Sequence, residues 1–206
     1  MEMTNAVAHN LKTPLCIING FSENLREESG YLTKQHYINV IQEQANEMDI
    51  LVHKMLDFSK LETDSAKLNI KSFNIKTELE NIAKKYNNIS SKNIIVTADD
   101  KEIFADKELM ELVFENLIEN AVKYSKDNSD IKISFANNNF NISNECDEIS
   151  KKDLKKIWKP YNRLEKDEEV RGTGIGLSIV KHILKLHRIK PYTEYSGGRL
   201  IIGFYI

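Results

Sequence analysis

Residues 8–58 carry the strongest constraint on the fold, because their apolar positions recur at alternating steps of three and four. The first stripe comprises Ala8, Leu11, Leu15, Ile18, Ser22 and Leu25. The second stripe comprises Tyr37, Ile41, Gln44, Met48, Leu51, Met55 and Phe58. This period is typical of long helices that pack nearly parallel, as in bundles and coiled coils. The opening segment therefore predicts two such helices.

The junction between the stripes predicts a hairpin, with Ser29-Gly30 as a helix stop and Thr33 as the cap of the second helix. A flanking row of Ile38, Ala45 and Val52 widens the second stripe. Each stripe is too wide for a single partner helix. We therefore expect two chains to pair their α-helical hairpins in a dimeric four-helix bundle. A monomeric hairpin docked on the rest of the protein is the alternative.

After Leu61 the period changes, and short strand patterns mix with helical ones. Strands are expected at 73–75, 94–98, 102–105, 131–136, 140–143, 192–195 and 200–205. Helices are expected at 78–86, from the cap Asp106 to about 124 and at 151–157, and a last helix is expected to follow the glycine cluster at Gly172 and to reach about residue 187. Strands and helices without strict alternation indicate an α+β sandwich. We expect the domains to cover residues 1–65 and 66–206.

Composition narrows the classes of function. Lys and Arg number 29 against 31 Asp and Glu, a formal charge of −2, so a surface made for nucleic acid is not expected. No apolar run approaches the ~18–20 residues that span a bilayer. The start, Met1-Glu2-Met3-Thr4, lacks the basic-then-apolar order of a signal peptide. We expect the chain, as given, to be cytoplasmic.

His9 opens the segment His9-Asn10-Leu11-Lys12-Thr13-Pro14-Leu15 in the first helical pattern. At about 100° per residue the apolar stripe lies nearly opposite His9, while Thr13 shares its exposed face. An uncharged imidazole on a solvent face can act as a nucleophile. Most exposed helical histidines are nevertheless ordinary surface residues. We interpret the others in that way: His36, His53, His182 and His187.

Two further segments suit phosphate and metal chemistry. Asn116, Asn120 and Lys123 are spaced four and three, so they share one stripe of a helix. Carboxamide oxygens can bind Mg²⁺ and an ammonium can pair with phosphate, although the same residues also suit an ordinary solvated face. The glycines of residues 172–177 can present backbone amides to phosphate at the start of a helix. They follow a charged loop instead of a strand, which does not fit the dinucleotide-binding fingerprint.

These segments resemble the sequence boxes of the sensor histidine kinases of bacterial two-component systems, and they occur in the family's order. Six of the seven positions of the His9 segment match the phosphoacceptor box His-Asp/Glu-Leu-Lys/Arg-Thr-Pro-Leu. Residues 115–125 resemble the asparagine box and residues 172–181 the second glycine box. Residues 157–163 resemble the aromatic box, which precedes a lid at 165–171. The resemblance implies a dimerisation and histidine phosphotransfer domain followed by a GHKL-type ATP-binding domain.

The resemblance also implies a role for each candidate residue. His9 would accept the γ-phosphate of ATP beside Asn10, and Thr13 would position water for dephosphorylation of the partner. Asn116 and Asn120 would bind Mg²⁺. The nucleotide contacts would comprise Asn116, Asn120, Lys123, Tyr124, Asn144, Arg163, Arg171, Gly172, Thr173, Gly174, Gly176 and Leu177. The implied partners are a second copy of the chain and a response-regulator receiver domain. The chain would be the cytosolic part of a membrane-bound sensor, with membrane segments outside it.

Two positions depart from the family pattern. Asn10 replaces the acid that follows the histidine, and an amide is a very weak base. The first glycine box, commonly Asp-x-Gly-x-Gly-Ile, reads Asn144-Glu145-Cys146-Asp147-Glu148-Ile149. Both glycines are missing, and Asn144 replaces the adenine-binding Asp. We therefore expect weaker nucleotide binding.

Three functions are compatible with these observations. The first is ATP-dependent autophosphorylation of His9 and phosphotransfer to an aspartate of a response regulator, with a regulator phosphatase as a further activity. The second is a catalytically weak or inactive, kinase-like dimeric scaffold that binds a response regulator. The third is an ATPase of the chaperone or DNA-repair type, against which the histidine helix and the missing basic surplus argue.

Asn10 generates the first prediction. Autophosphorylation should be faster in Asn10→Asp, because the resemblance implies that an acid here orients the imidazole and takes its proton, whereas an amide can accept a hydrogen bond but is a very weak base. Initial autokinase rates of the two chains test this, and an unchanged or lower rate in the variant would refute it.

Overall fold

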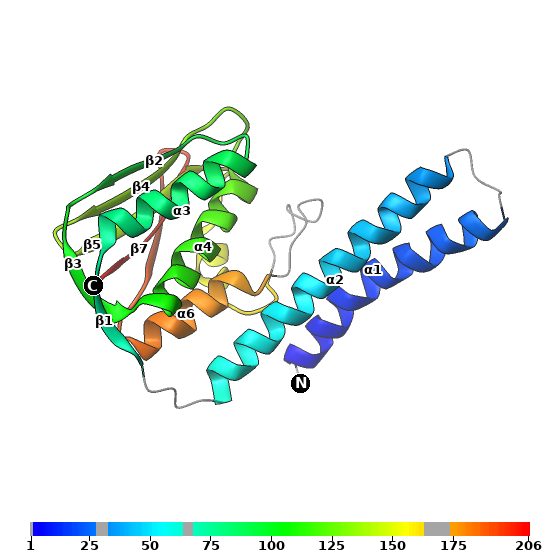
Figure 1. Ribbon diagram of the computed structural model, residues 1–206, viewed down its shortest axis with the longest axis horizontal. Helices are drawn as coiled ribbons and strands as arrows, with labels where there is room; N and C mark the ends of the chain where they lie inside the picture. The colour runs from blue at the N-terminus through cyan, green and yellow to red at the C-terminus, as the bar shows by residue number, and fades with distance from the viewer. Residues whose placement is uncertain (1, 28–32, 64–67, 163–173) are drawn as a thin grey trace. The chain divides into compact units, whose positions relative to one another are not determined.

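The computed structural model describes residues 2–27, 33–63, 68–162 and 174–206, and it divides the chain into two compact units. Within these ranges, side chains are described for residues 11–26, 33–56, 68–162 and 174–206. The first unit comprises residues 1–60 and is a helical hairpin, whereas the second comprises residues 61–206 and contains every strand of the described chain (Figure 1).

The hairpin consists of α1 (Glu2–Glu27), which continues through Pro14, and α2 (Lys34–Thr63). Thr33 caps α2 as predicted, because its Oγ1 accepts a hydrogen bond from the backbone N–H of His36 at 3.2 Å. Three residues of the predicted stripe, spaced seven positions apart, are buried: Tyr37, Gln44 and Leu51. The ring of Phe21 meets Tyr37 edge-on at 5.7 Å between centroids. The predicted stripe of α2 therefore forms the inner face of the hairpin.

The flanking row of α2 stays exposed within a single chain. Ile38 is 37% exposed and Val52 41%, Ala45 is exposed, and Leu56 next to this row is 53% exposed. Leu15 on α1 is 47% exposed. The hairpin thus buries one apolar stripe and leaves a second row in contact with solvent.

The second unit is built on a five-stranded mixed sheet in the order β2-β4-β5-β7-β6. The strands are β2 (Ile94–Ala98), β4 (Ile131–Ala136), β5 (Asn139–Glu145), β6 (Tyr192–Ser196) and β7 (Arg199–Tyr205). β2 and β4 are parallel, and the remaining neighbours are antiparallel. A separate two-stranded sheet pairs β1 (Ile70–Asn74) with β3 (Glu102–Asp106).

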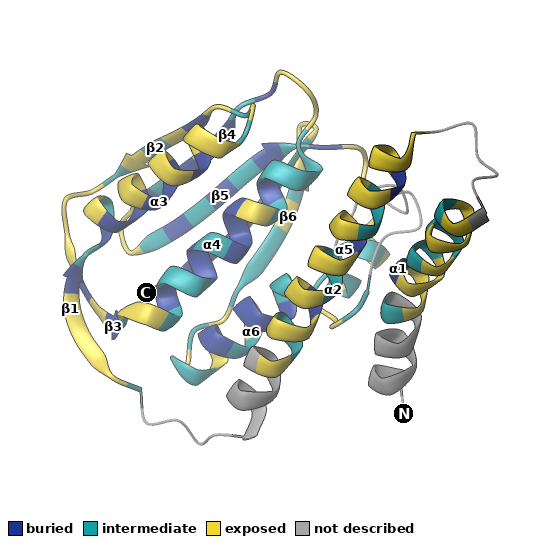
Figure 2. Cartoon of the chain, turned by 45° about the vertical axis from the view of Figure 1, so that its right-hand side comes forward, coloured by how far each residue is buried: buried dark blue, intermediate teal, exposed yellow. Residues whose placement is uncertain are grey.

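Three helices cover one face of the larger sheet: α3 (Ile75–Ile89), α4 (Lys107–Tyr124) and α6 (Gly176–Leu186) (Figures 1 and 2). A shorter helix, α5 (Lys151–Lys156), precedes the aromatic segment. The core between helices and sheet is aromatic, because the ring of Phe140 lies 5.1 Å from that of Phe114 and 4.8 Å from that of Phe204. Burial alternates along β4 and β5, as a sheet with one covered face requires.

Local capping explains where the helices begin. Asp106 caps α4 as predicted, with its Oδ1 accepting from the N–H of Leu109 at 3.3 Å. α3 begins earlier than the predicted residue 78, because Asn74 caps it by accepting from the N–H of Thr77 at 3.0 Å. α6 begins at Gly176, the last glycine of the cluster that is predicted to precede it. A hairpin closes the chain as expected, with Gly197 and Gly198 at positive φ.

His187 is more than an ordinary surface residue, so that interpretation is wrong. It is half-buried at the end of α6, where its Nδ1 lies 2.9 Å from the carbonyl of Ile183. Its Nε2 accepts a hydrogen bond from the N–H of Asp106 at 3.0 Å. The imidazole therefore joins the end of α6 to the residue that caps α4.

The substitution His187→Ala should lower the free energy of unfolding of the second unit by about 1–3 kcal/mol, because the N–H of Asp106 loses its acceptor. Denaturant titration followed by the fluorescence of Trp158, the single tryptophan, measures this. Lys185→Ala, an exposed position on the same helix, should stay within about 0.5 kcal/mol of the parent chain. Equal stabilities of the two variants would contradict a bridging role for His187.

Candidate functional site

Helix α4 positions the predicted polar stripe. It buries one row of residues against the sheet and α6: Met110, Val113, Phe114, Leu117, Ile118 and Ala121. Asn116 is also buried, at 4% exposure, whereas Asn120 is half-buried. The Nδ2 of Asn116 donates to the carbonyl of Leu112 at 2.8 Å. That hydrogen bond fixes the carboxamide and directs its oxygen away from the turn.

The oxygen of this carboxamide lies against the start of α6. A Cβ at position 176 would lie only 2.9 Å from Asn116 Oδ1, so glycine is what allows the two helices to approach here. Among the described residues, Asn116 Oδ1 is buried and accepts no hydrogen bond. Buried polar atoms normally have partners, and an exception often indicates a place for an ion or ligand. A carboxamide oxygen is a ligand that Mg²⁺ accepts, so the residues present fit this metal.

The two carboxylates of the asparagine segment are bound to α3. Lys85 Nζ lies 2.7 Å from Glu115 Oε1, and the hydroxyl of Tyr86 donates to Glu119 Oε1 at 3.1 Å. The hydrogen bond to Glu115 raises the pKa of Lys85, and burial raises the pKa of the Tyr86 phenol. On the α3 side of α4, Glu115 is therefore paired with a cation and Glu119 accepts a hydrogen bond from a neutral phenol.

No group of three or more His, Cys, Asp or Glu residues in the described part of the chain could hold a metal ion. A metal here would depend on carboxamide oxygens, with phosphate oxygens and water completing its shell. Asn116 and Asn120 remain the predicted metal ligands.

The last turn of α4 pairs a cation with an aromatic ring. Lys123 Nζ lies 5.1 Å from the centroid of the Tyr124 ring, within the range of a cation–π contact. Both side chains are half-buried. The structure thus brings together the two residues that the resemblance assigns to phosphate and to nucleoside.

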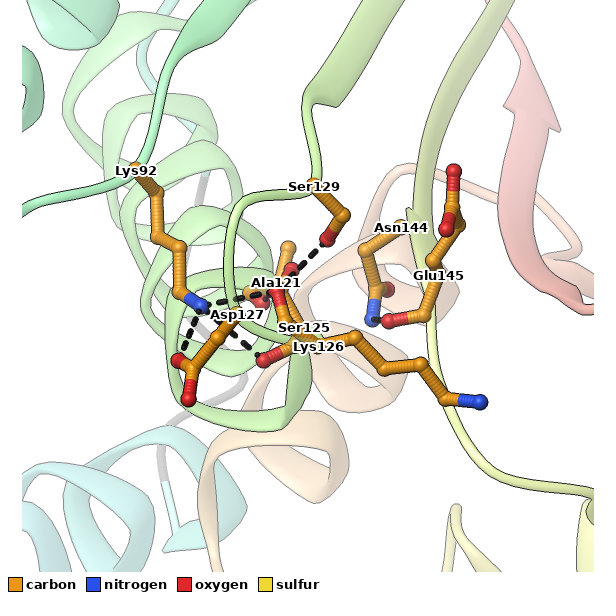
Figure 3. Close-up of polar contacts among 8 residues, drawn as sticks. All are labelled: Lys92, Ala121, Ser125, Lys126, Asp127, Ser129, Asn144 and Glu145. Carbon is orange, nitrogen blue, oxygen red and sulfur yellow. Dashed lines mark hydrogen bonds and ion pairs between the residues drawn. The ribbon is translucent and has the colours of Figure 1, made fainter.

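Asn144 lies near the end of β5, beside the segment that follows α4 (Figure 3). Its side chain is buried, and its Nδ2 has only a long contact of 3.5 Å with the carbonyl of Glu145. The backbone N–H of Lys126 donates to that same carbonyl at 2.9 Å. This hydrogen bond joins the end of α4 to the end of β5 next to Asn144.

The glycine segment is described only in part. Gly174 has a φ of 67°, and its carbonyl accepts from the N–H of Tyr161 at 2.8 Å. Gly176 and Leu177 form the first turn of α6. Four candidate nucleotide contacts and the predicted lid at 165–171 lie outside the described residues: Arg163, Arg171, Gly172 and Thr173.

The candidate phosphoacceptor lies in the other unit. α1 includes His9 and Asn10, whose side chains lie outside the described part of the chain. Thr13 is exposed on α1, as expected. No helix of the described residues combines the length and the apolar character that crossing a bilayer requires.

Three residues that hold the loop 125–130 next to Asn144 are not among the predicted site residues: Lys92, Ser129 and Arg199. Lys92 and Ser129 come from connecting loops and Arg199 from the start of β7, so their positions follow from the tertiary fold. Singly they carry no sequence signal, because an isolated Lys, Ser or Arg is common on any surface.

Comparison with known families agrees with both units. Residues 1–64 match the His Kinase A (phospho-acceptor) domain, and residues 105–202 match the histidine kinase-, DNA gyrase B- and HSP90-like ATPase family. The sensor protein kinase WalK of Staphylococcus aureus is 28% identical over 213 residues, which cover 96% of this chain and 51% of that relative. The chain belongs to the sensor histidine kinases.

Another relative in this family is the sensor histidine kinase ArsS of Helicobacter pylori, which is 25% identical over 95% of the chain and 44% of its own length. The chain therefore spans about half the length, or less, of these relatives.

Solved histidine kinases share the fold. The crystal structure of the histidine kinase ThkA in complex with the response regulator protein TrrA is 25% identical, with a TM-score of 0.78 over 100% of this chain and 60% of that one. The Acinetobacter baumannii histidine kinase AdeS is 22% identical, with a TM-score of 0.77 over 96% of both chains. The predicted fold, a helical hairpin followed by an α+β sandwich, is confirmed, while dimerisation stays a prediction.

Gly176→Ala tests the contact between α6 and Asn116. The added Cβ would lie 2.9 Å from a buried oxygen, so the carboxamide must move. We expect the affinity for Mg²⁺–ATP to fall roughly tenfold, in line with the cost of overpacking. Calorimetry with a nonhydrolysable ATP analogue measures this. Gly20→Ala is the matched control, because no atom lies within 4 Å of the new Cβ on α1. Parent-like affinity in Gly176→Ala would argue against this contact as part of the site.

Proposed function

We propose that the chain is an ATP-dependent protein-histidine kinase that phosphorylates His9. The phosphoryl group then passes to an aspartate of a response-regulator receiver domain. The observation that carries this proposal is the buried, unpaired oxygen of Asn116 against the glycine that begins α6. The phosphoacceptor-type segment around His9 in the helical unit supplies the acceptor. We assign histidine phosphotransfer to residues 1–65 and ATP binding to residues 66–206.

Different residues of the second unit would contact the metal ion, the phosphates and the nucleoside. Asn116 and Asn120 would hold Mg²⁺, which supplies neutralisation of phosphate charge when bound. Lys123 pairs with phosphate oxygens, and the glycine segment with the start of α6 presents backbone amides to them. Tyr124 and Asn144 contact the nucleoside and the base. Phosphoryl transfer depends mainly on positioning and charge compensation, which this set of residues provides.

The chemical step takes place on the imidazole of His9. Its neutral ring attacks the γ-phosphorus through Nε2, a P–N bond forms, and the bond from that phosphorus to the β–γ bridging oxygen breaks. ADP leaves with that oxygen, and the imidazole proton at Nδ1 remains available to a base. Asn10 can accept a hydrogen bond from Nδ1–H, but it cannot take the proton. Thr13, which is exposed on α1, would position a water molecule for the opposing activity, the hydrolysis of the partner's phosphoaspartate to aspartate and inorganic phosphate.

Two observations support the partners of this proposal. The exposed row of Ile38, Ala45 and Val52 supports a homodimer, because a second hairpin would bury it in a four-helix bundle. The ThkA structure contains a response regulator bound to a histidine kinase, which supports a receiver domain as partner.

The alternative function is a catalytically weak or inactive dimeric scaffold that binds a response regulator. Asn10 and Asn144 favour it, because each replaces a residue through which the family's usual chemistry or base recognition would run. In that case ATP binding persists while transfer to His9 does not.

Incubation with γ-labelled ATP separates the two functions. We expect acid-labile, alkali-stable label on the chain, and we expect its loss in His9→Ala. His53→Ala is the control, because His53 is another exposed histidine of the helical unit. Label that persists in His9→Ala would contradict the assignment of the acceptor. ATP binding without label in the parent chain would favour the scaffold.

A further inference from the structure

Lys92, which lies between α3 and β2, inserts its ammonium into a cluster of oxygens at the end of α4 (Figure 3). Only 10% of its side chain is exposed. The Nζ donates to the carbonyls of Ser125 at 3.2 Å and Lys126 at 2.8 Å, and lies 3.1 Å from Asp127 Oδ1. An ammonium has three donors, so every N–H of Lys92 has an oxygen acceptor.

The position of this ammonium is electrostatically favourable. The last carbonyls of a helix lack intrahelical partners and carry the negative end of its dipole, so a cation there is stabilising. Ser125 is the C-cap of α4, and its N–H and Oγ both donate to the carbonyl of Ala121. Lys92 therefore compensates the carbonyls that follow the helix, where the chain turns towards β4.

The peptide groups of Lys126 transmit this contact to β5. The carbonyl of Lys126 accepts from Lys92 and also from Ser129 Oγ at 2.7 Å. Its backbone N–H donates to the carbonyl of Glu145 at 2.9 Å. Lys92 and Asn144 lie on opposite sides of this loop (Figure 3). The loop that Lys92 holds is thus bonded to the residue next to Asn144.

Asn144 depends on this loop because its own side-chain contact is weak. Its Nδ2 lies 3.5 Å from the carbonyl of Glu145, at the limit of a hydrogen bond. The carboxamide is buried, so its orientation follows from β5 and from the neighbouring loop. A shift of the loop would change the space beside Asn144 and the direction in which its carboxamide donates and accepts hydrogen bonds to a base.

A second cation holds the far end of the same loop. Arg199 donates from NH2 to the carbonyls of Asp130 at 2.8 Å and Ser143 at 3.1 Å, and its NH1 lies 2.9 Å from Glu145 Oε1. Residues 125–130 are therefore held between two cations, and Arg199 also connects them to the end of β5 through Ser143 and Glu145. Cys146 and Glu148 occupy the two positions of this region where the family commonly has glycines. The region thus lacks those glycines, and the side chains of Lys92 and Arg199 hold the neighbouring loop.

We propose that Lys92 is a positioning residue that sets the base selectivity of the nucleotide site, because its ammonium fixes the loop against Asn144. The proposal rests on the proposed function, in which Asn144 contacts the base. Lys92 itself touches no substrate. Its removal leaves three oxygens without their shared donor, and the Lys126 carbonyl keeps only Ser129 as its donor, while the phosphate-binding residues on α4 and α6 keep their contacts.

The test compares the full chain with Lys92→Ala in calorimetric titrations with nonhydrolysable ATP and GTP analogues in the presence of Mg²⁺. We expect ATP-analogue binding to weaken roughly tenfold, the size of a lost charge-assisted hydrogen bond, and the preference for adenine over guanine to shrink by a similar factor. Lys84→Met, an exposed lysine of α3, is the control and should leave both values unchanged.

Chemical rescue distinguishes positioning from general destabilisation. Propylammonium has the atoms that Lys92→Ala removes, so it should restore affinity and selectivity. Tetramethylammonium at the same concentration should not, because it has no N–H donor. Restoration by both salts, or by neither, would overturn the proposal.

Ser129→Ala provides a milder variant in case Lys92→Ala does not fold. It removes one of the two side-chain bonds to the Lys126 carbonyl, so selectivity should change in the same direction by a smaller factor. Unchanged selectivity in Ser129→Ala would overturn the proposal. Parent-like values in a folded Lys92→Ala would also overturn it and leave the kinase function intact. A parent chain that binds no ATP analogue would refute the proposed function itself, and with it the role of Lys92.

Discussion

The close approach of the first residue of α6 to Asn116 is the constraint on which the nucleotide-binding unit depends. It requires a residue without a side chain at position 176 and a carboxamide held by its own helix at position 116. Around this contact, α3 covers the acidic side of α4 through Lys85 and Tyr86. The aromatic core packs α4 against the sheet through the contact of Phe114 with Phe140. A polar atom can stay buried without a partner here because the surrounding helices leave it little freedom to turn away.

Much of the fold was predictable because local and global signals agree. The three-and-four spacing predicts the hairpin, and Tyr37, Gln44 and Leu51 are buried as that spacing requires. Asp106 precedes a strongly apolar helix and caps it. Asn74 also caps a helix, but it follows a strand pattern with no break, so the start of α3 was placed too late. Short capping motifs of this kind depend on backbone angles that periodicity does not report.

The site was predictable only where its residues lie close together in sequence. Asn116, Asn120 and Lys123 share one helix, so their spacing predicts a common stripe. Lys92 and Arg199 reach the same loop from segments more than 100 residues apart, and only strand pairing and the crossover between β2 and β4 bring them there. His187 was misread for the same reason, since its acceptor role depends on Asp106, far away in the chain. Tertiary hydrogen bonds between distant loops leave no periodic trace.

The exposed row on α2 links folding to mass action. A helix that buries only one of two apolar rows would gain further hydrophobic stabilisation if the second row were buried as well. Any molecule that binds the folded hairpin in preference to the unfolded one therefore stabilises the hairpin. If the occupant is a second copy, the helical unit is more stable in concentrated than in dilute solution. The strand-containing unit has its own aromatic core, so its stability would not depend on the protein concentration in this way. Dilution would then separate the melting of the two halves of one polypeptide.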